Sequence, residues 1–321
     1  MTQAQSNPFL YSDSNKRYYT YDYYLRRNFG GKCAKLALDA GFTCPNIDGR
    51  CGRGGCIYCS DRGSGDFAPE ATLSISEQIQ RQKQLLSHKW DVSRCIAYFQ
   101  AHTNTYAPVE RLRAVYEEAL AQKGIVGLNI ATRADCLPDD VVSYLAELAE
   151  RTALTVELGL QTSNDQTAAY INRGHSFSDF CRGYQALRRA SNRIGICVHL
   201  ILGLPGEGEA EMLQTARDVA VLHPDQIKLH LLHVLKGTRM ARELEDGGYQ
   251  PLERAQYIRL VADVLELLPP DTVIGRLTGD GAKDALLAPL WSLKKTTVIN
   301  DIDKLLYERG SYQGIRWRSG S

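Results

Sequence analysis

Four of the nine cysteines in the 321-residue chain lie within one short segment, at positions 44, 51, 56 and 59. Thiolates are soft ligands that select zinc or iron–sulfur clusters. Cys56 and Cys59 are separated by two residues, which allows both sulfur atoms to bind one metal centre. Glycines 49, 52, 54 and 55 let the backbone curl closely around a bound group. We therefore predict a metal or redox centre in this segment.

The cysteine spacing by itself leaves two kinds of metal site open. A structural zinc site is closed and tetrahedral, and four thiolates could supply its ligands. However, zinc ribbons usually pair two C-x2-C units, and this segment contains one. An open iron–sulfur cluster needs three thiolates and leaves one iron atom free for another ligand. A set of reduced structural cysteines is less favoured, because four cysteines fall so close together.

The overall composition is that of an ordinary globular protein, with 44% hydrophobic and 23% charged residues. No run of about 18 apolar residues occurs, so we expect no membrane span. The N-terminus has no apolar signal core, and we therefore expect a cytoplasmic protein that keeps its cysteines reduced. The 38 basic and 37 acidic residues give a net charge of +1, which indicates no particular partner.

A regular alternation of strand and helix patterns must position the cysteine segment. Six short, near-continuous apolar runs are typical of buried parallel strands, and amphipathic helix patterns separate them. Successive β-then-α units favour an open doubly wound sheet or a full or partial (β/α) barrel. In either fold, the functional loops follow the C-terminal ends of the strands. The predicted strands are 33–38, 94–100, 126–131, 154–159, 196–202 and 226–232, and the predicted helices are 73–86, 108–122, 138–151, 177–191, 209–222 and 251–268.

The alternating pattern divides the chain into three expected parts. They are an N-terminal extension at 1–30, a core at 31–245 and a C-terminal extension at 246–321. One irregular stretch, from about residue 39 to 73, follows the first predicted strand and holds all four clustered cysteines. Structureless loops longer than about 12–15 residues are uncommon in compact domains unless they are functional or disordered. This stretch is therefore where we expect the chemistry.

The cysteine segment resembles that of a known family. Cys44, Cys56 and Cys59 follow the C-x11-C-x2-C pattern of YtqA/YhcC-type radical SAM proteins, which are relatives of the Elongator catalytic subunit. The letters CPNIDGRCGRGGC (44–56) are similar to that family's CPNxDGxxGxGGC. The resemblance implies an α/β fold, a partial (β/α)6 TIM-type radical SAM barrel with an N-terminal extension and a small C-terminal α-rich region. It begins near residue 16 and continues in order through YFQAHTNTYAP (98–108), TRADCLPD (132–139), ELGLQT (157–162), NRGH (172–175), HLILGLPGE (199–207), KLHLLHVLKGT (228–238) and APLW (288–291).

The resemblance implies two cofactors. Cys44, Cys56 and Cys59 would hold a [4Fe–4S] cluster, while Cys51 stands outside the family's ligand pattern. In radical SAM enzymes, the iron atom without a protein ligand binds the amino and carboxylate groups of S-adenosylmethionine (SAM). One electron then cleaves the sulfonium and generates a 5′-deoxyadenosyl radical. An electron donor such as flavodoxin or ferredoxin is therefore implied as a partner.

Motifs at successive strand ends supply candidate contacts to SAM and to the substrate. Each of them, taken singly, could equally be a turn, a helix cap or a core residue. Their order along the chain is what favours a functional role. The candidate SAM contacts are Gln100, Thr103, Asn104, Thr132, Arg133, Asp135, Glu157, Gln161, Gly203, Leu204 and Pro205, and the candidate catalytic side chains are Lys228, Lys236 and His175.

Basic residues at the two ends of the chain suggest contact with RNA. Residues 16–32 interleave basic side chains with tyrosines, and basic groups can hold phosphates while aromatic faces stack on unpaired bases. An alternative is that the tyrosines pack the extension onto the barrel and the charges face the solvent. The candidate RNA contacts are Lys16, Arg17, Arg26, Arg27, Lys294 and Lys295.

The family resemblance favours tRNA as the substrate. Elongator-type relatives act on the wobble uridine, and the MnmL-type step converts its 5-carboxymethylaminomethyl group toward 5-aminomethyl. Such a base lies in a single-stranded loop and can be splayed into a pocket. Two alternatives remain open from the sequence: a zinc-stapled RNA-binding or adaptor protein without catalysis, and a radical SAM enzyme that acts on a small molecule.

Overall fold

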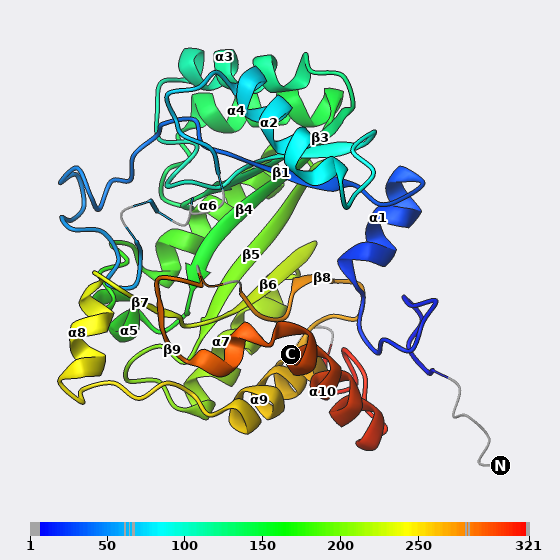
Figure 1. Ribbon diagram of the computed structural model, residues 1–321, viewed down its shortest axis with the longest axis vertical. Helices are drawn as coiled ribbons and strands as arrows, with labels where there is room; N and C mark the ends of the chain where they lie inside the picture. The colour runs from blue at the N-terminus through cyan, green and yellow to red at the C-terminus, as the bar shows by residue number, and fades with distance from the viewer. Residues whose placement is uncertain are drawn as a thin grey trace.

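A seven-stranded parallel sheet forms the centre of the molecule (Figure 1). The computed structural model describes residues 7–60, 62–63, 65, 68–279, 281 and 283–318. All six predicted strands are present, and a seventh, β8, extends the sheet beyond β6. The strands are β1 (Ala34–Leu38), β2 (Cys95–Phe99), β3 (Ile125–Thr132), β4 (Ala153–Gln161), β5 (Ile194–Leu202), β6 (Gln226–Leu231) and β8 (Val273–Arg276), in that spatial order.

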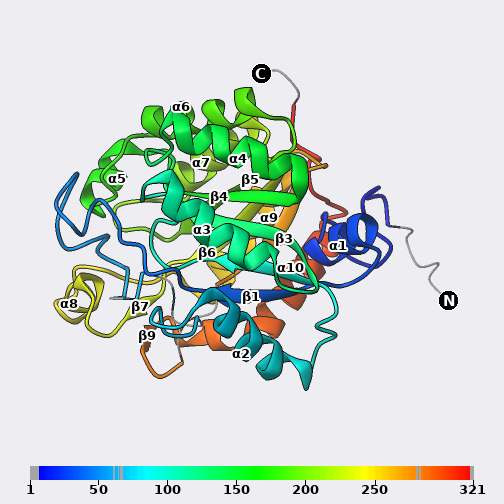
Figure 2. The ribbon, with the colours of Figure 1, turned by 90° about the horizontal axis from the view of Figure 1, so that it is seen from above.

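Helices follow the strands in the predicted βα alternation and cover one face of the sheet (Figure 2). Two of them begin with capping boxes, at Ser74 with Glu77 and at Ser176 with Asp179, which satisfy the first free backbone amides. Helix α1 (Tyr21–Phe29), the short helices α5 and α8 and the last helix, α10, lie outside the predicted set. The helices that follow strands are α2 (Ile75–Ser87), α3 (Val109–Leu120), α4 (Asp139–Arg151), α5 (Asp165–Tyr170), α6 (Phe177–Ala190), α7 (Glu209–Leu222), α8 (Arg239–Glu245), α9 (Arg254–Leu267) and α10 (Lys295–Glu308).

The sheet is curled, so its two faces have different environments. Apolar side chains such as Leu36, Phe99 and Leu128 point outward and form one continuous core with the helices. Alternate residues point inward because successive side chains in a strand face opposite sides. The inward set includes Lys35 and Glu157, as their ion pair across the sheet shows. The fold is therefore the predicted α/β partial barrel, with an apolar outer layer and a polar interior.

The N-terminal segment closes one end of this partial barrel. Thr20 bridges to Ile274 of β8, and α1 (Tyr21–Phe29) then leads into β1 at the opposite edge of the sheet. Leu25 of α1 packs on Cys33 and Ile96. The long cysteine-bearing loop lies at the other end of the strands, far from α1 (Figures 1 and 2). The open interior therefore faces the cysteines on one side and α1 on the other.

A small appendage completes the end that carries the cysteines. The antiparallel pair β7 (Val234–Leu235) and β9 (Leu286–Ala288) packs beside α8, and a 3-10 helix, η1 (Leu290–Leu293), leads into α10. None of the helices in the described ranges is both long and apolar enough to span a membrane.

Candidate active site

Three of the four clustered cysteines line one cavity inside the partial barrel. Cys44, Cys56 and Cys59 border a space of about 280 Å³, which we call the cysteine cavity. Cys51 is exposed and lies outside this lining. The three converging thiols are the set that the sequence predicts as cluster ligands. Their common cavity is what an open three-thiolate site requires.

Asparagine side chains hold the cysteine loop in shape. Asn46 donates from Nδ2 to Cys56 Sγ at 3.3 Å and to the carbonyl of Asn172 at 3.0 Å, and its Oδ1 accepts from Cys44 Sγ at 2.8 Å. Asn172 in turn donates to the carbonyl of Gly55 at 2.6 Å. Gly55 has a φ of 71°, a conformation that favours glycine. The NRGH segment therefore clamps the loop from across the cavity.

Cys56 and Cys59 share a hydrogen bond that prepares one of them as a thiolate. The pKa of Cys56 lies well below that of a free thiol, chiefly because Cys59 donates to it, and the Arg173 guanidinium adds to this effect. The same hydrogen bond raises the pKa of Cys59 well above its ordinary value. A thiolate is the form that binds metal, so this pair is poised for ligation.

Two buried donors at the cavity lack an acceptor. Among the described residues, Arg173 Nε and Gln100 Nε2 are buried without a hydrogen-bond partner, and both side chains line the cysteine cavity. Buried polar groups in native proteins are nearly always satisfied. A bound group rich in acceptor atoms, such as cluster sulfides or the amino-acid part of SAM, fits these two positions. The residues present therefore suit the implied cofactors.

The predicted SAM contacts divide into those that line the cysteine cavity and those that do not. Asn104 is fully buried and donates to three carbonyls, so it shapes the loop behind the cavity wall. Gly203, Leu204 and Pro205 lie outside the lining, and the carbonyl of Gly203 accepts from Tyr249 at 2.7 Å. The residues that line the cavity are Gln100, Thr103, Thr132, Arg133, Glu157 and Gln161.

Backbone strain is concentrated at this cavity. Only four non-glycine residues in the described part of the chain have a positive φ. Two of them, His102 at 58° and Gln161 at 77°, line the cavity, and Asn172 at 54° clamps the cysteine loop. Such conformations cost of order 1–3 kcal/mol each and persist where the surrounding structure enforces them.

A charged network lies at one side of the cavity, and we call it the floor: Lys35, Tyr98, Glu157, His199 and Lys228. Tyr98, Glu157 and His199 line the cavity, and the two lysines lie directly behind them in contact with Glu157. Glu157 is fully buried and pairs with Lys228, with Lys35 at 3.3 Å and with His199 Nε2 at 2.8 Å. Burial by itself would raise the pKa of Glu157, but the two lysines and His199 outweigh it and hold the pKa well below its usual range. The carboxylate is therefore ionised.

The other floor residues surround that carboxylate. Burial, followed by the charge of Lys228, lowers the pKa of His199 to about 4, so this imidazole is neutral at physiological pH. The ring of Tyr98 lies 4.6 Å from Lys228 Nζ and 5.0 Å from Lys35 Nζ. The floor thus contains two ammonium groups held by one glutamate and one aromatic ring.

The candidate catalytic residues are not gathered in one place. Lys228 belongs to the floor, whereas Lys236 is exposed and donates to the carbonyl of Asp284 at 2.8 Å. His175 Nδ1 donates to the carbonyl of Ser176 at 3.1 Å, and burial together with Arg173 lowers the pKa of His175 to about 4. Of these three, Lys228 is the one that pairs with the floor carboxylate, Glu157.

Sequence reasoning missed several side chains of the site, among them Lys35, Tyr98 and Arg173. Lys35 carried a usable signal, because it is the lone charged residue in an apolar predicted strand. Tyr98 and Arg173 lie inside quoted motifs, but nothing in the motif letters shows that their side chains enter the cavity.

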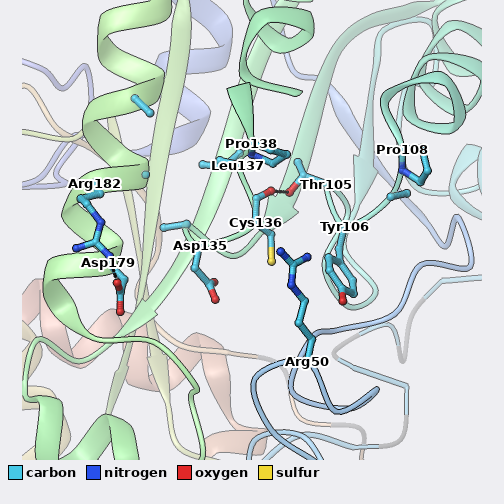
Figure 3. A pocket seen from close by; sticks show the side chains of 14 residues that line it. Arg50, Thr105, Tyr106, Pro108, Asp135, Cys136, Leu137, Pro138, Asp179 and Arg182 are labelled. Carbon is cyan, nitrogen blue, oxygen red and sulfur yellow. Dashed lines mark hydrogen bonds and ion pairs between the residues drawn. The ribbon is translucent and has the colours of Figure 1, made fainter. Parts of the chain in front are cut away.

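A second, outer cavity of about 720 Å³ lies beside the first (Figure 3). Asp135 lines the outer cavity and Arg133 lines the cysteine cavity, and the two form an ion pair at 2.8 Å. This pair is therefore part of the wall between the cavities. On the opposite side, Arg50 from the cysteine loop lies over the ring of Tyr106, 5.5 Å from its centroid.

The candidate RNA contacts near the N-terminus are largely engaged within the protein. Arg17 is buried and donates to the carbonyl of Ser311, Lys16 pairs with Asp303, and Arg26 pairs with Asp13 and Asp22. Arg27 lies against the Tyr23 ring. Lys294 and Lys295 stand at the start of α10. The tyrosines stack on one another, as Tyr11 does on Tyr19 at 5.1 Å.

Comparison with protein families shows which family the chain belongs to. A model of the Radical SAM superfamily matches residues 46–219, which is more than half of the chain. The chain belongs to the radical SAM superfamily. A model of the Radical_SAM C-terminal domain matches residues 224–308, so the family resemblance extends past the sixth strand.

Individual relatives place the chain within this superfamily. YtqA of Bacillus subtilis is 50% identical over 310 residues, which are 97% of this chain and 96% of YtqA. A tRNA uridine(34) acetyltransferase of Dehalococcoides mccartyi is 30% identical over 177 residues, which are 52% of this chain and 38% of that protein. The structure of archaeal Methanocaldococcus infernus Elp3 superposes with a TM-score of 0.67 at 17% identity, over 88% of this chain and 64% of that one, and shows the same fold.

Proposed function

We propose that this protein is a radical SAM enzyme that modifies the wobble uridine of tRNA. The observation that carries the cofactor assignment is the convergence of Cys44, Cys56 and Cys59 on one cavity that also holds two buried donors without acceptors. A [4Fe–4S] cluster with SAM supplies hydrogen abstraction from an unactivated carbon. Reduction of the cluster calls for a one-electron donor such as flavodoxin or ferredoxin.

The residues of the cavity have distinct tasks in this proposal. Arg173 and Gln100 would offer their unsatisfied donors to the bound cofactor. Arg133 is held by Asp135 and by the carbonyl of Arg173 at 2.6 Å, which fixes its guanidinium at the cavity wall. Enclosure by the curled sheet keeps water away from a reactive intermediate.

The tRNA assignment is supported by named relatives. One relative is a tRNA uridine(34) acetyltransferase, and its similarity covers half of this chain. An enclosed cavity suits a base that leaves a single-stranded loop, because a flipped base enters a pocket alone. We propose conversion of 5-carboxymethylaminomethyluridine toward 5-aminomethyluridine as the reaction.

The cluster assignment is tested by cysteine substitution in anaerobically purified protein. Replacing Cys44, Cys56 or Cys59 with Ala should remove iron, sulfide and SAM cleavage, because each supplies one of three ligands. Cys51→Ala is the matched control and should leave all three unchanged. Loss of the cluster in Cys51→Ala with retention in Cys44→Ala would show that the ligand assignment is wrong. Stoichiometric zinc without iron would instead favour a zinc-stapled RNA-binding protein.

The substrate is tested by nucleoside mass spectrometry of tRNA from a deletion strain. We expect 5-carboxymethylaminomethyluridine to accumulate and 5-aminomethyluridine or its derivatives to decrease. Complementation with the Cys56→Ala variant should fail, whereas the Cys51→Ala variant should restore the profile. An unchanged modification profile would refute the tRNA assignment and would favour a small-molecule substrate.

A further inference from the structure

The floor of the cysteine cavity carries more positive than negative charge. Among the described residues that form it, Glu157 is the only carboxylate, and it faces the ammonium groups of both Lys35 and Lys228. Arg276, which also lines the cavity, adds a positive charge, and the remaining floor residues are uncharged. Burial raises the pKa of Tyr98 above that of a free phenol and the pKa of Cys197 to about 12, and His199 is neutral. One positive charge is therefore left without a counter-charge.

An uncompensated charge in a protein interior is costly. Transfer of an ammonium group from water into an apolar environment is strongly unfavourable unless an opposite charge accompanies it. Burial, followed by the charge of Lys228, lowers the pKa of Lys35 to about 8, which reports this cost. Glu157 does not offset this cost for both lysines, because its single negative charge is shared. Its oxygens already contact His199, Asn129 and both ammonium groups.

Lys35 is the more exposed member of the pair, next to the lining residues Tyr98 and Glu157. Its side chain keeps 25% of its surface exposed, compared with 6% for that of Lys228. Apart from Glu157, its ammonium faces only the rings of Tyr21 and Tyr98, with centroids at 4.6 and 5.0 Å. The nearby set of Glu157, Cys197 and His199 also has a spacing that could suit a metal ion. Two lysines on the same glutamate oppose a cation there and favour an anion.

We propose that a carboxylate of the substrate binds at Lys35 and supplies the missing negative charge at the floor. This inference rests on the proposed function, in which the 5-carboxymethylaminomethyl group carries that carboxylate into the cavity. A backbone phosphate is the other anion on a tRNA substrate. That phosphate is attached to the ribose and not to the base, so it does not travel with the wobble substituent. The floor would thus select the substituent by its negative charge.

The test compares two tRNAs that differ only at the wobble substituent, 5-carboxymethylaminomethyl against 5-methylaminomethyl. Binding is measured with cluster-loaded protein without reductant, so no turnover occurs. We expect the wild type to prefer the carboxylate form by roughly tenfold or more, as for other hydrogen bonds to charged groups. Lys35→Met should bind both forms equally, and Lys35→Arg should retain the preference. Lys304→Met, at an exposed lysine of α10, is the matched control and should behave as wild type. Preserved discrimination in Lys35→Met would overturn the proposal.

A second measurement separates failure of this inference from failure of the proposed function. Iminodiacetate, which carries carboxylates next to a secondary amine, should raise the melting temperature of wild-type protein but not that of Lys35→Met. If neither tRNA binds while iminodiacetate still stabilises only the wild type, the tRNA assignment fails and the carboxylate site stands. If inorganic phosphate stabilises the wild type as well as iminodiacetate does, or if neither probe distinguishes the two proteins, the carboxylate site is refuted.

Discussion

Single residues in this protein are placed for chemistry at the expense of stability. Gln161 adopts a left-handed backbone conformation at the end of β4, Arg173 keeps a buried donor unsatisfied, and Lys35 shares its counter-charge, Glu157, with Lys228. Each of these features is unfavourable in the free protein. They occur together at one cavity, which is typical of functional sites, where strain and burial prepare a ligand-binding geometry.

Replacing Lys35 should make the protein more stable. We expect Lys35→Met to raise the free energy of unfolding by roughly 1–3 kcal/mol at pH 7, because it leaves a neutral Glu157–Lys228 pair. The pKa of Lys35 is about 8 in the folded protein and near 10.5 when unfolded. Between pH 8 and pH 10.5 the unfolded wild type therefore binds more protons than the folded wild type. The free energy of unfolding of the wild type rises with pH over this range. The difference in the free energy of unfolding between Lys35→Met and the wild type should therefore decrease as the pH rises.

Denaturant unfolding of both proteins from pH 7 to pH 10.5 measures this difference. Lys32→Met controls for the general loss of a lysine, and it should be within about 0.5 kcal/mol of the wild type at each pH. A Lys35→Met protein that is less stable than the wild type at pH 7 would show that the ammonium is compensated.

At the scale of elements, close packing of helices fixes the loops that carry the site. Gly183 of α6 lies against the carbonyl of Ala134, where a β-carbon would come within 2.1 Å of the oxygen. Ala134 stands between Arg133 and Asp135, the ion pair in the wall between the two cavities. The position of α6 therefore determines the position of this wall.

Adding one methyl group at this contact should disturb both stability and the site. We expect Gly183→Ala to lower the free energy of unfolding by roughly 1–3 kcal/mol, because a backbone carbonyl cannot move aside as a flexible side chain can. SAM binding to the cluster-loaded protein should weaken as well, since Arg133 shifts with its loop. Calorimetric titration and thermal unfolding measure the two effects. Gly248→Ala is the matched control, because its nearest neighbour would lie at 3.5 Å, an ordinary contact. Equal stability of the two variants would contradict this packing argument.

At the scale of the whole molecule, the curled sheet separates an apolar exterior layer from a polar lumen closed by α1 at one end. The lumen encloses His199, and His175 is largely buried near the NRGH clamp. Both imidazoles have pKa values of about 4 in the folded protein, mainly because of burial. The free energy of unfolding of the whole domain at acid pH therefore depends on these two histidines of the site.

Stability of the cluster-free protein should fall as the pH decreases from about 6.5 to 4. In this range the unfolded histidines bind protons and the folded ones do not, so protonation favours unfolding by roughly 2–3 kcal/mol for each residue. Above pH 6.5 neither contributes a pH dependence. His199→Gln should reduce the loss of unfolding free energy between pH 6.5 and 4 by the contribution of one histidine. His88→Gln, which lies outside the lumen, should not change it. Urea unfolding at several pH values measures this, and identical slopes for wild type and His199→Gln would refute it.

Much of the fold followed from local signals in the chain. The apolar runs predict all six strands from β1 to β6, and capping residues such as Ser74 predict where helices begin. The short strand β8, of four residues, has no such signal, because its strand conformation depends on pairing with β6 and on the bridge to Thr20. The prediction of RNA contacts at residues 16–32 relied on composition. Composition does not reveal that Arg17 is buried or that Lys16 and Arg26 pair with aspartates.

The sequence by itself determined the cysteine set and the order of strands, because sulfur spacing and apolar periodicity are local properties of the chain. Only the tertiary structure decided which side chains share the lumen. Lys35 and Glu157 are 122 residues apart, and Arg173 is 117 residues from Cys56. Such contacts arise when parallel strands align side by side and their alternate residues face inward. The charge imbalance at the floor, and with it the proposed carboxylate site, exists only after that alignment.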